Sequence, residues 1–309
     1  MLRALLVVMI LAVAVGLAAF GYLTTPAIIP ASALAPHTPD PANGKVVFHA
    51  GGCASCHATP NQDDKTLLGG GLGLKSPFGT FYAPNISPDR NHGIGGWSEA
   101  EFVTALTKGT SQVGEHYYPA FPYTSYQRAR IGDLRDLFAY MKTLPPVQSQ
   151  DRDHDLPFPF NVRRGLGLWK QWYLDGRPFA PDPGKPDAWN RGAYLVNALS
   201  HCAECHSPRD AFGGIIEAKR FAGGPMPDGK GWAPNITQKS LSSWSEKDLV
   251  TLLETGDLPD GDYVGGEMAA VVRNTAQLPA ADRAAIATYI KSLPPVDGPL
   301  PPSPPPAAK

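Results

Sequence analysis

The sequence has almost no net charge and very little cysteine. Its 27 lysine and arginine residues nearly balance its 28 aspartate and glutamate residues, which leaves a net charge of −1 over 309 residues. Such a chain has no electrostatic bias toward nucleic acid or acidic substrates, so we expect no nucleic-acid partner. Only four cysteines occur, and all of them fall in two short motifs. No cysteine is left for another role.

Glycine and proline, in contrast, are abundant. The chain has 32 glycines and 33 prolines, which together form about a fifth of it, where about 12% is usual. Hydrophobic residues make up 43% of the sequence, enough to bury ordinary cores. The length allows about two domains of roughly 100–200 residues each. Loops must therefore form much of the fold.

The cysteines occur in the same motif twice, in GGCASCHATP and in SHCAECHSPR. Each motif has two cysteines and then a histidine; the residues are Cys53, Cys56 and His57, and Cys202, Cys205 and His206. The pattern C-x-x-C-H is typical of covalent c-type haem attachment. Two thiols one helical turn apart can each bond a vinyl group of one porphyrin, and the histidine then places its imidazole under the iron as the proximal ligand. The sequence therefore predicts two covalently bound haem c groups.

Other uses of these cysteines explain less of the motifs. A shared four-thiolate zinc or iron–sulfur site would not explain a histidine after both pairs, and it would have to bridge 149 residues. A thioredoxin-like redox motif would need a βαβ context, which neither motif has. Covalent haem remains the interpretation that accounts for every residue of both motifs.

Residues 1–23 are predicted to be a membrane anchor or a signal segment. Residues 4–23 carry no charge, and twenty residues are long enough to span a bilayer as a helix. A small-residue cleavage site exists at residues 33–35, but it lies about a dozen residues beyond the apolar run. We therefore expect an uncleaved anchor in the cytoplasmic membrane, with a soluble periplasmic protein after cleavage as the alternative. Arg3 precedes the run and no Lys or Arg follows before position 45, so the positive-inside rule places the haem domains in the periplasm.

After a linker over residues 24–40, expected to be extended and flexible, the chain repeats itself. The first unit carries CASCH, YAPNIS, GGWSEAEFVTALTKG and DLRDLFAYMKTLPPV, and the second carries CAECH, WAPNIT, SSWSEKDLVTLLETG and ADRAAIATYIKSLPPV. A period near 149 residues indicates duplicated domains. We expect domains over residues 41–147 and 189–297, an inter-domain strap over residues 148–188 and a disordered proline-rich tail over residues 298–309.

Two helices in each unit have predictable ends. The first begins at a capping-box spacing, Ser98 with Glu101 or Ser245 with Asp248, and ends at a glycine, Gly109 or Gly256. The second is the last helix of the unit, where apolar residues recur at i, i+3, i+4 and i+7 and a double proline follows. The predicted core of each unit is therefore helical.

The two units differ at the position expected to supply the sixth iron ligand. Trp97 corresponds to Trp244, and the same offset of 147 places Phe121 opposite Met268. Methionine is the usual distal ligand of a small cytochrome c and raises the reduction potential, so Met268 is the predicted distal ligand in the second unit. The alternative for Met268 is a core-filling side chain. Phe121 has no lone pair, which leaves His116, another side chain or an open site for the first iron.

From about residue 41 to residue 296 the sequence resembles the multi-haem cytochrome c subunit of membrane-bound alcohol and aldehyde dehydrogenases and related periplasmic dehydrogenases. The resemblance lies in SPFGTFYAPNISPDRNHGIGGWSEAEF, HYYPAFPYTSY, DLPFPFNVRRGLGLWKQWYL, WNRGAYLV and HCAECHSPR with the RFAGGP after it. It implies a mainly α fold of two tandem, small class I-type cytochrome c domains with loop-rich haem pockets after the N-terminal helix. It also supports His57 and His206 as proximal ligands and Met268 as a distal ligand. The alcohol dehydrogenase subunits have three such domains and often carry methionine where Phe121 stands, and this chain departs from them in both respects.

These observations together predict a dihaem c-type cytochrome that transfers electrons. The expected donor is a periplasmic dehydrogenase, and the expected acceptor in the respiratory chain is a terminal oxidase or a soluble cytochrome. Such a chain is an electron-transfer protein or the cytochrome subunit of an oxidoreductase complex. The alternative from another class is a dihaem cytochrome c peroxidase with haem 1 as the peroxide site.

Overall fold

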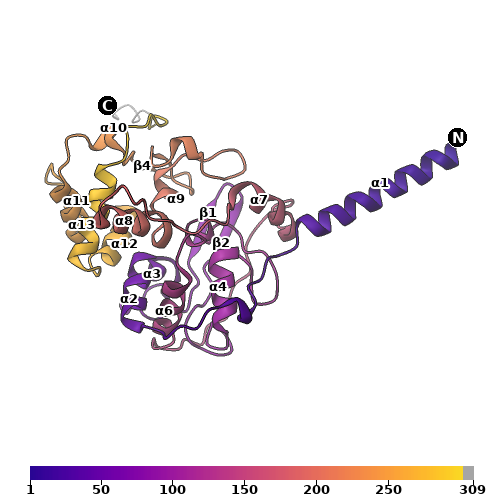
Figure 1. Cartoon of the computed structure of the whole chain (residues 1–309), viewed down its shortest axis with the longest axis horizontal. Helices are drawn as coiled ribbons and strands as arrows, with labels where there is room; N and C mark the ends of the chain where they lie inside the picture. Colours follow the sequence, from indigo (N-terminus) through magenta and orange to yellow (C-terminus); the bar gives the residue numbers. More distant parts are fainter. Residues whose placement is uncertain (302–309) are drawn as a thin grey trace, which may run out of the picture.

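The computed structural model describes residues 1–301, and it shows two small helical domains with one long helix projecting from them (Figure 1). The projecting helix, α1 (Leu2–Leu23), has no buried residue. Within residues 1–301 it is the one helix long and apolar enough to cross a membrane. Most of the predicted proline-rich tail lies outside the described residues.

The first domain combines short helices with one hairpin. Its elements are α2 (Pro41–Ala50), α3 (Cys53–His57), β1 (Gly73–Ser76), β2 (Gly79–Tyr82), α4 (Glu99–Lys108), α5 (Tyr123–Tyr126) and α6 (Ile131–Met141). Strands β1 and β2 pair antiparallel, with Gly73 opposite Tyr82. Helices α2 and α6 pack against each other. Gly44 stands at their contact, where a Cβ atom would overlap the carbonyl of Asp136, so only glycine allows this approach.

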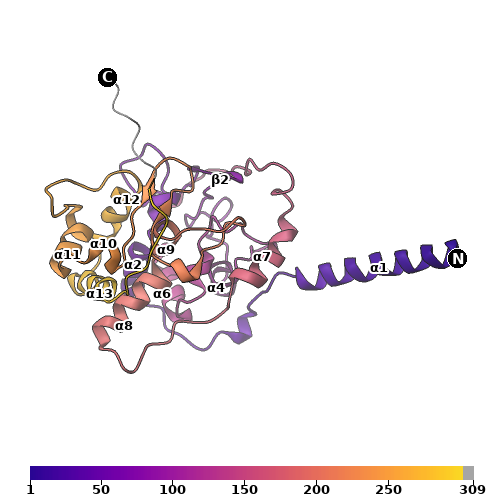
Figure 2. The ribbon, with the colours of Figure 1, turned by 90° about the horizontal axis from the view of Figure 1, so that it is seen from above.

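The second domain follows a strap and repeats the same plan. The strap contains η2 (Arg163–Gly165) and α7 (Leu166–Tyr173), and the domain contains α8 (Asp187–Tyr194), the π-helical turn η3 (Leu195–Leu199), α9 (Cys202–His206), η4 (Glu217–Lys219), β3 (Gly224–Pro225), β4 (Trp232–Ala233), α10 (Gln238–Leu241), α11 (Glu246–Thr255), α12 (Gly266–Thr275) and α13 (Ala280–Lys291). Helices α8 and α13 pack as α2 and α6 do, with Gly192 against the carbonyl of Ala285. Figure 2 shows α7 at the foot of α1, on the side of the body away from α11 and α13.

The predicted helix ends are confirmed. Ser98 and Glu101 form a capping box at the start of α4, and Gly109 ends that helix in the left-handed conformation with φ 57°. Helix α11 likewise begins with a capping box, formed by Ser245 and Asp248, and ends at Gly256 in the left-handed conformation. The apolar stripe on α6 is buried at Leu137 and Met141, and α13 buries its own stripe in the same way. The mainly α class is confirmed as well.

The segment over residues 24–40 was expected to be flexible, but it lies along the first domain. The backbone N–H of Ile29 donates to Thr104 Oγ1 at 3.0 Å, and Arg135 donates to the carbonyl of Ala35 at 2.6 Å. Leu34 packs against the hydrophobic core. Because its polar groups have partners on the domain and its apolar side chains have a core to join, this segment is held in place.

Helix α1 ends in a set of contacts that we call the anchor socket, formed by Thr24, His116, Arg164, Lys170 and Gln171. Thr24 is fully buried. Its carbonyl accepts a hydrogen bond from His116 Nε2 at 2.9 Å, and its Oγ1 accepts one from Arg164 Nε at 2.8 Å. Gln171 donates to the last carbonyl of α1, and Arg164 donates to another in its last turn. Two of the free carbonyls at the helix end, those of Gly21 and Leu23, are thus satisfied by the strap, which ties the end of α1 to the body.

Within the anchor socket, Lys170 links His116 to the end of α4. Its ammonium is buried and donates to the carbonyls of Lys108 and Gly109 at 2.7 and 2.6 Å and to His116 Nδ1 at 3.0 Å. The three hydrogens of the ammonium therefore match three acceptors, two of them at the C-terminal end of α4, where a cation is favourable.

Replacing Lys170 with methionine is expected to destabilise the first domain by about 2–4 kcal/mol, since three buried acceptors lose their donor and one unsatisfied buried group costs roughly 1–3 kcal/mol. Denaturant unfolding of the detergent-solubilised protein measures the change. The matched control is Lys185→Met, which removes an exposed lysine of the same strap and should change stability by less than about 0.5 kcal/mol. Equal stability of the two variants would show that the Lys170 contacts are not stabilising.

Candidate haem-binding sites

Each C-x-x-C-H motif forms a one-turn helix, α3 or α9, so its two cysteines lie one turn apart as predicted. None of the four cysteines forms a disulfide. Burial raises the pKa of Cys53 to about 12 and that of Cys202 to about 11. Within residues 1–301 no group of three or more His, Cys, Asp or Glu side chains could hold a metal ion. The thiols are therefore not grouped into the set of three or four ligands that a structural zinc or iron–sulfur site needs.

The two motif histidines have the same orientation in both domains. His57 donates from Nδ1 to the carbonyl of Pro84 at 2.8 Å, and His206 donates from Nδ1 to the carbonyl of Pro234 at 2.7 Å. This hydrogen bond fixes the tautomer, because a carbonyl only accepts, and it leaves Nε2 free with its lone pair. Burial lowers the pKa of both rings, so both are held in the neutral form that binds a metal.

The two proline carbonyls belong to the repeated A-P-N tripeptides. The side chain of Asn85 donates to the carbonyl of Val147 at 2.7 Å, and that of Asn235 donates to the carbonyl of Val296 at 2.8 Å. Each asparagine thus ties the turn that holds the histidine to the segment after the last helix of its domain. The repeat of YAPNIS and WAPNIT was the available signal for these prolines, but sequence reasoning did not assign them a role.

Met268 lies in the first turn of α12 and is half-buried. The helix begins at Gly266, two residues before it. Helix α12 packs against α11 of its own domain and against α2 and α3 of the first domain. The methionine is therefore carried by an element that touches both domains.

Phe121, at the corresponding position of the first domain, lies in a cluster of aromatic rings. Its ring centroid is 5.7 Å from that of Tyr117 and 5.8 Å from that of Tyr126. Burial raises the pKa of Tyr117 to about 12, so this phenol stays neutral. The cluster gives the first domain an apolar wall where the second domain has a thioether.

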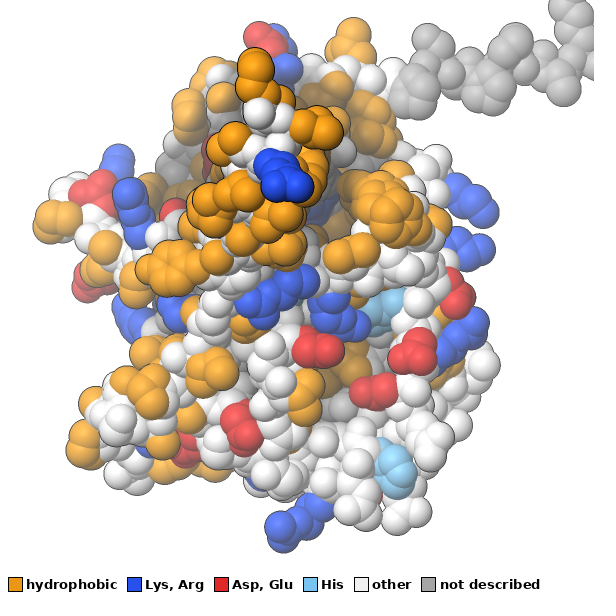
Figure 3. Space-filling model, turned by 90° about the vertical axis from the view of Figure 1, so that its right-hand side faces the viewer, with side chains coloured by type: hydrophobic (Ala, Val, Ile, Leu, Met, Phe, Trp, Pro, Cys, Tyr) orange, Lys and Arg blue, Asp and Glu red, His pale blue; other side chains and the backbone are white. Residues whose placement is uncertain are grey.

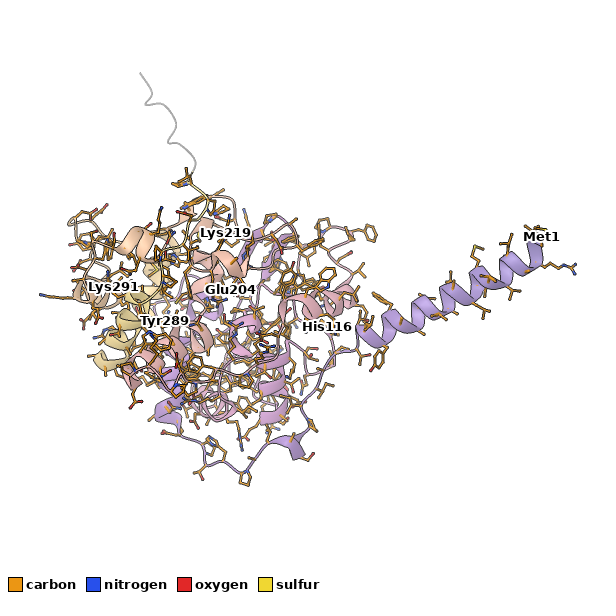
Figure 4. All side chains as sticks on the ribbon, turned by 45° about the horizontal axis from the view of Figure 1, so that its top comes forward. Met1, His116, Glu204, Lys219, Tyr289 and Lys291 are labelled. Carbon is orange, nitrogen blue, oxygen red and sulfur yellow. The ribbon has the colours of Figure 1, made fainter. Side chains whose placement is uncertain are left out.

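His116 belongs to a different network. Both of its ring nitrogens are engaged in the anchor socket, Nε2 with the Thr24 carbonyl and Nδ1 with Lys170. The side chain is buried at the foot of α1, where Figure 4 labels it, and neither nitrogen is free for an iron. The structure therefore does not bring His116 together with His57 as a ligand pair.

The two haem-attachment motifs are adjacent in space. Ser200 donates to the carbonyl of Ala50 at 2.9 Å, and Asn274 of α12 donates to Ser55 Oγ at 2.9 Å. Glu204, labelled in Figure 4, accepts from Thr124 of the first domain at 2.6 Å. These contacts join residues within or directly before one motif to the other domain.

The pKa of Cys56 in the first motif is affected by groups of the second domain. Burial, the Glu267 carboxylate and the Cys205 thiol all raise the pKa of Cys56, to about 11. Glu267 of α12 and Cys205 of the second motif therefore lie near enough to Cys56 to affect its ionisation.

The residues present fit two haem c groups. Each domain offers two thiols one turn apart and one neutral imidazole whose Nδ1 is tied to a carbonyl and whose Nε2 is free. This is the donor set that covalent attachment and proximal ligation need. The same set occurs twice, with the same backbone support.

The cytochrome c family matches the chain twice, over residues 41–145 and 190–294. The chain is 46% identical over 284 residues to a diheme cytochrome c-type protein of Cereibacter sphaeroides, covering 89% of this chain and 93% of that protein.

Two further relatives are dehydrogenase subunits. The fructose dehydrogenase cytochrome subunit of Gluconobacter japonicus is 39% identical over 86% of this chain and 54% of its own length. The cytochrome c subunit of a quinone alcohol dehydrogenase from Gluconacetobacter polyoxogenes is 36% identical over 82% of this chain and 56% of its own length. The chain thus spans about half the length of these two subunits and nearly all of the diheme protein.

Proposed function

The chain belongs to the cytochrome c family and carries two covalently bound haem c groups, and from this premise we propose that it relays electrons from a periplasmic dehydrogenase to the respiratory chain. When bound, the haem groups supply one-electron exchange between Fe(III) and Fe(II). The acceptor would be a terminal oxidase or another cytochrome. We further propose that α1 is retained as an anchor in the cytoplasmic membrane, with both domains on the periplasmic side.

The observation that carries this proposal is the contact between the two domains beside their haem motifs. Ser200, two residues before the second motif, bonds Ala50, three residues before the first, and Asn274 of α12 bonds Ser55 within the first motif. Buried side chains of both domains belong to one hydrophobic cluster. Two redox sites held by one core at short range form a relay inside a single chain.

The direction of transfer follows from the ligands. We propose His57 and His206 as proximal ligands and Met268 as the distal ligand in the second domain. A thioether ligand raises the potential of its iron. Electrons would therefore pass from the first site to the second. The named relatives are a diheme cytochrome and dehydrogenase subunits, which gives no support to the peroxidase alternative.

A pulse of one-electron reductant tests the relay. In the purified full-length protein, we expect two phases of absorbance change. The rate of the first, reduction of the protein by the reductant, increases with protein concentration. The rate of the second, transfer of the electron between the two haem groups, does not depend on protein concentration. The control is a variant lacking both cysteines of the second motif, which should lose the second phase. If the second phase scales with protein concentration, transfer occurs between molecules and the intramolecular relay is wrong.

The donor is tested separately. Purified quinoprotein or molybdenum dehydrogenases, each with its own substrate, are mixed with the oxidised protein and haem reduction is recorded. We expect at least one of them to reduce both haem groups, and substrate alone to reduce neither. Reduction by none of them would reject the donor class while leaving the intramolecular relay intact.

A further inference from the structure

The surface around the foot of α1 carries large exposed apolar side chains. Beyond the helix itself, they are Phe158, Phe160, Val162 and Trp172 of the strap and Phe212 of the second domain. We call these five residues the strap patch. Trp172 and Phe212 contact each other across the two segments, with ring centroids 5.9 Å apart. A monomeric soluble protein seldom leaves such side chains together in water without a use for them.

The anchor socket brings the strap patch next to the end of α1. Phe160 and Val162 lie just before Arg164, which bonds both Thr24 and the last turn of the helix. Trp172 directly follows Gln171, whose side chain donates to the carbonyl of Leu23 at 3.3 Å. Figure 3 looks at the face from which α1 projects, and hydrophobic side chains gather there around the helix.

The length of α1 sets where the membrane surface must lie. Residues 4–23 carry no charge, and twenty helical residues at 1.5 Å each span about 30 Å, the thickness of the hydrocarbon core. A hydrocarbon core spanned by α1 would therefore end at Leu23, directly at the socket. Tyr22 is exposed on the last turn, where an aromatic residue is expected at the headgroup level.

We propose that the strap patch is a lipid-facing surface that lies in the headgroup region of the membrane spanned by α1. The occupant is the bilayer because the anchor socket joins the patch to the end of the membrane anchor. Its composition fits, since exposed Trp and Phe side chains suit the boundary between the hydrocarbon core and the headgroups. This inference rests on the proposed retention of α1, and it adds that the first domain and the strap have a fixed orientation on the membrane.

Single added cysteines test the proposal, because the four native thiols are consumed by haem. Trp172→Cys and Phe160→Cys probe the patch at positions 69% and 42% exposed. The matched controls are Tyr263→Cys and Ile131→Cys, at positions 69% and 41% exposed and outside the patch. The full-length protein is placed in nanodiscs of phosphatidylethanolamine and phosphatidylglycerol, one chain per disc. The rate of alkylation by a charged, water-soluble maleimide is then measured and divided by the rate for a small neutral maleimide.

The ratio of the two alkylation rates, charged over neutral maleimide, should be several-fold lower for the patch cysteines than for their matched controls. In a parallel measurement on the wild-type chain, phospholipids with a photoreactive acyl chain should label peptides from residues 158–172 and not peptides containing Tyr263. Equal rates within each pair, together with no labelling of the strap, would overturn the proposal and leave the patch as a surface for a protein partner.

Carbonate extraction of membranes separates this inference from the proposed location. If the chain is released with the soluble fraction, retention of α1 is wrong and the patch proposal falls with it, while the intramolecular relay is unaffected. If the chain stays in the membrane and the patch reacts like the controls, only the lipid-facing surface is wrong.

Discussion

A chain in which Cys202 and Cys205 are both replaced by serine should contain one haem per polypeptide instead of two. Each domain has its own pair of thiols and its own carbonyl-tethered histidine, so loss of one attachment site leaves the other complete. Serine cannot form the thioether links that hold the porphyrin. The pyridine haemochrome assay on purified protein gives the haem-to-chain ratio, and intact mass gives the covalent adducts.

The mirror variant, with serine at Cys53 and Cys56, is the matched control and should also retain one haem. The two variants should differ in the potential of the haem that remains, because only the second domain has Met268 at the distal position. A ratio of two in either variant would show that the motif is not the attachment site. A ratio of zero would show that the two sites are not loaded independently.

The parts of the structure that the sequence predicted are those fixed by local chemistry. The capping boxes at Ser98 and Ser245, the glycines that end α4 and α11 and the buried stripe of α6 all depend on residues a few positions apart. The histidine orientation is partly local too, since its partner carbonyl sits in a tripeptide that repeats with the motif. A duplicated pattern doubles such signals, which is why the two-domain plan was predictable.

The parts that were not predicted depend on contacts between distant residues. The linker was expected to be flexible from its composition, but Ile29 and Ala35 have hydrogen-bond partners on α4 and α6. His116 was one of the options left open for the first iron because it lies near Phe121, whereas Thr24 and Lys170 contact both of its ring nitrogens. Nothing in the order of residues says that Lys170, more than fifty positions away, will lie beside that ring.

The contact between the domains is the other feature that composition cannot supply. Each haem motif alone predicts a complete small domain, and a flexible strap would allow any separation between two such domains. The pairs Ser200 with Ala50 and Asn274 with Ser55 instead join the two domains beside their haem motifs, and buried side chains of both domains share one hydrophobic core. Helix α12 belongs to both haem sites. It carries the proposed distal ligand of the second site and contacts α3, the motif helix of the first.

Replacing Met268 with alanine should lower the midpoint potential of one haem by about 0.2 V, a fraction of the roughly 0.8 V that axial ligands span. The sulfur-to-iron charge-transfer band of the oxidised protein should disappear at the same time. Potentiometric titration followed by visible absorbance measures both effects, and the other haem should keep its potential to within a few hundredths of a volt, on the order of a tenth of that change.

The matched control is Met226→Ala, which removes another methionine of the second domain, from the turn between β3 and β4. It should leave both potentials and the charge-transfer band unchanged. If Met226→Ala removes the band and Met268→Ala does not, the ligand assignment moves to Met226. If neither variant changes the spectrum, the second domain has no methionine ligand, and the proposed downhill transfer from the first site to the second loses its physical cause.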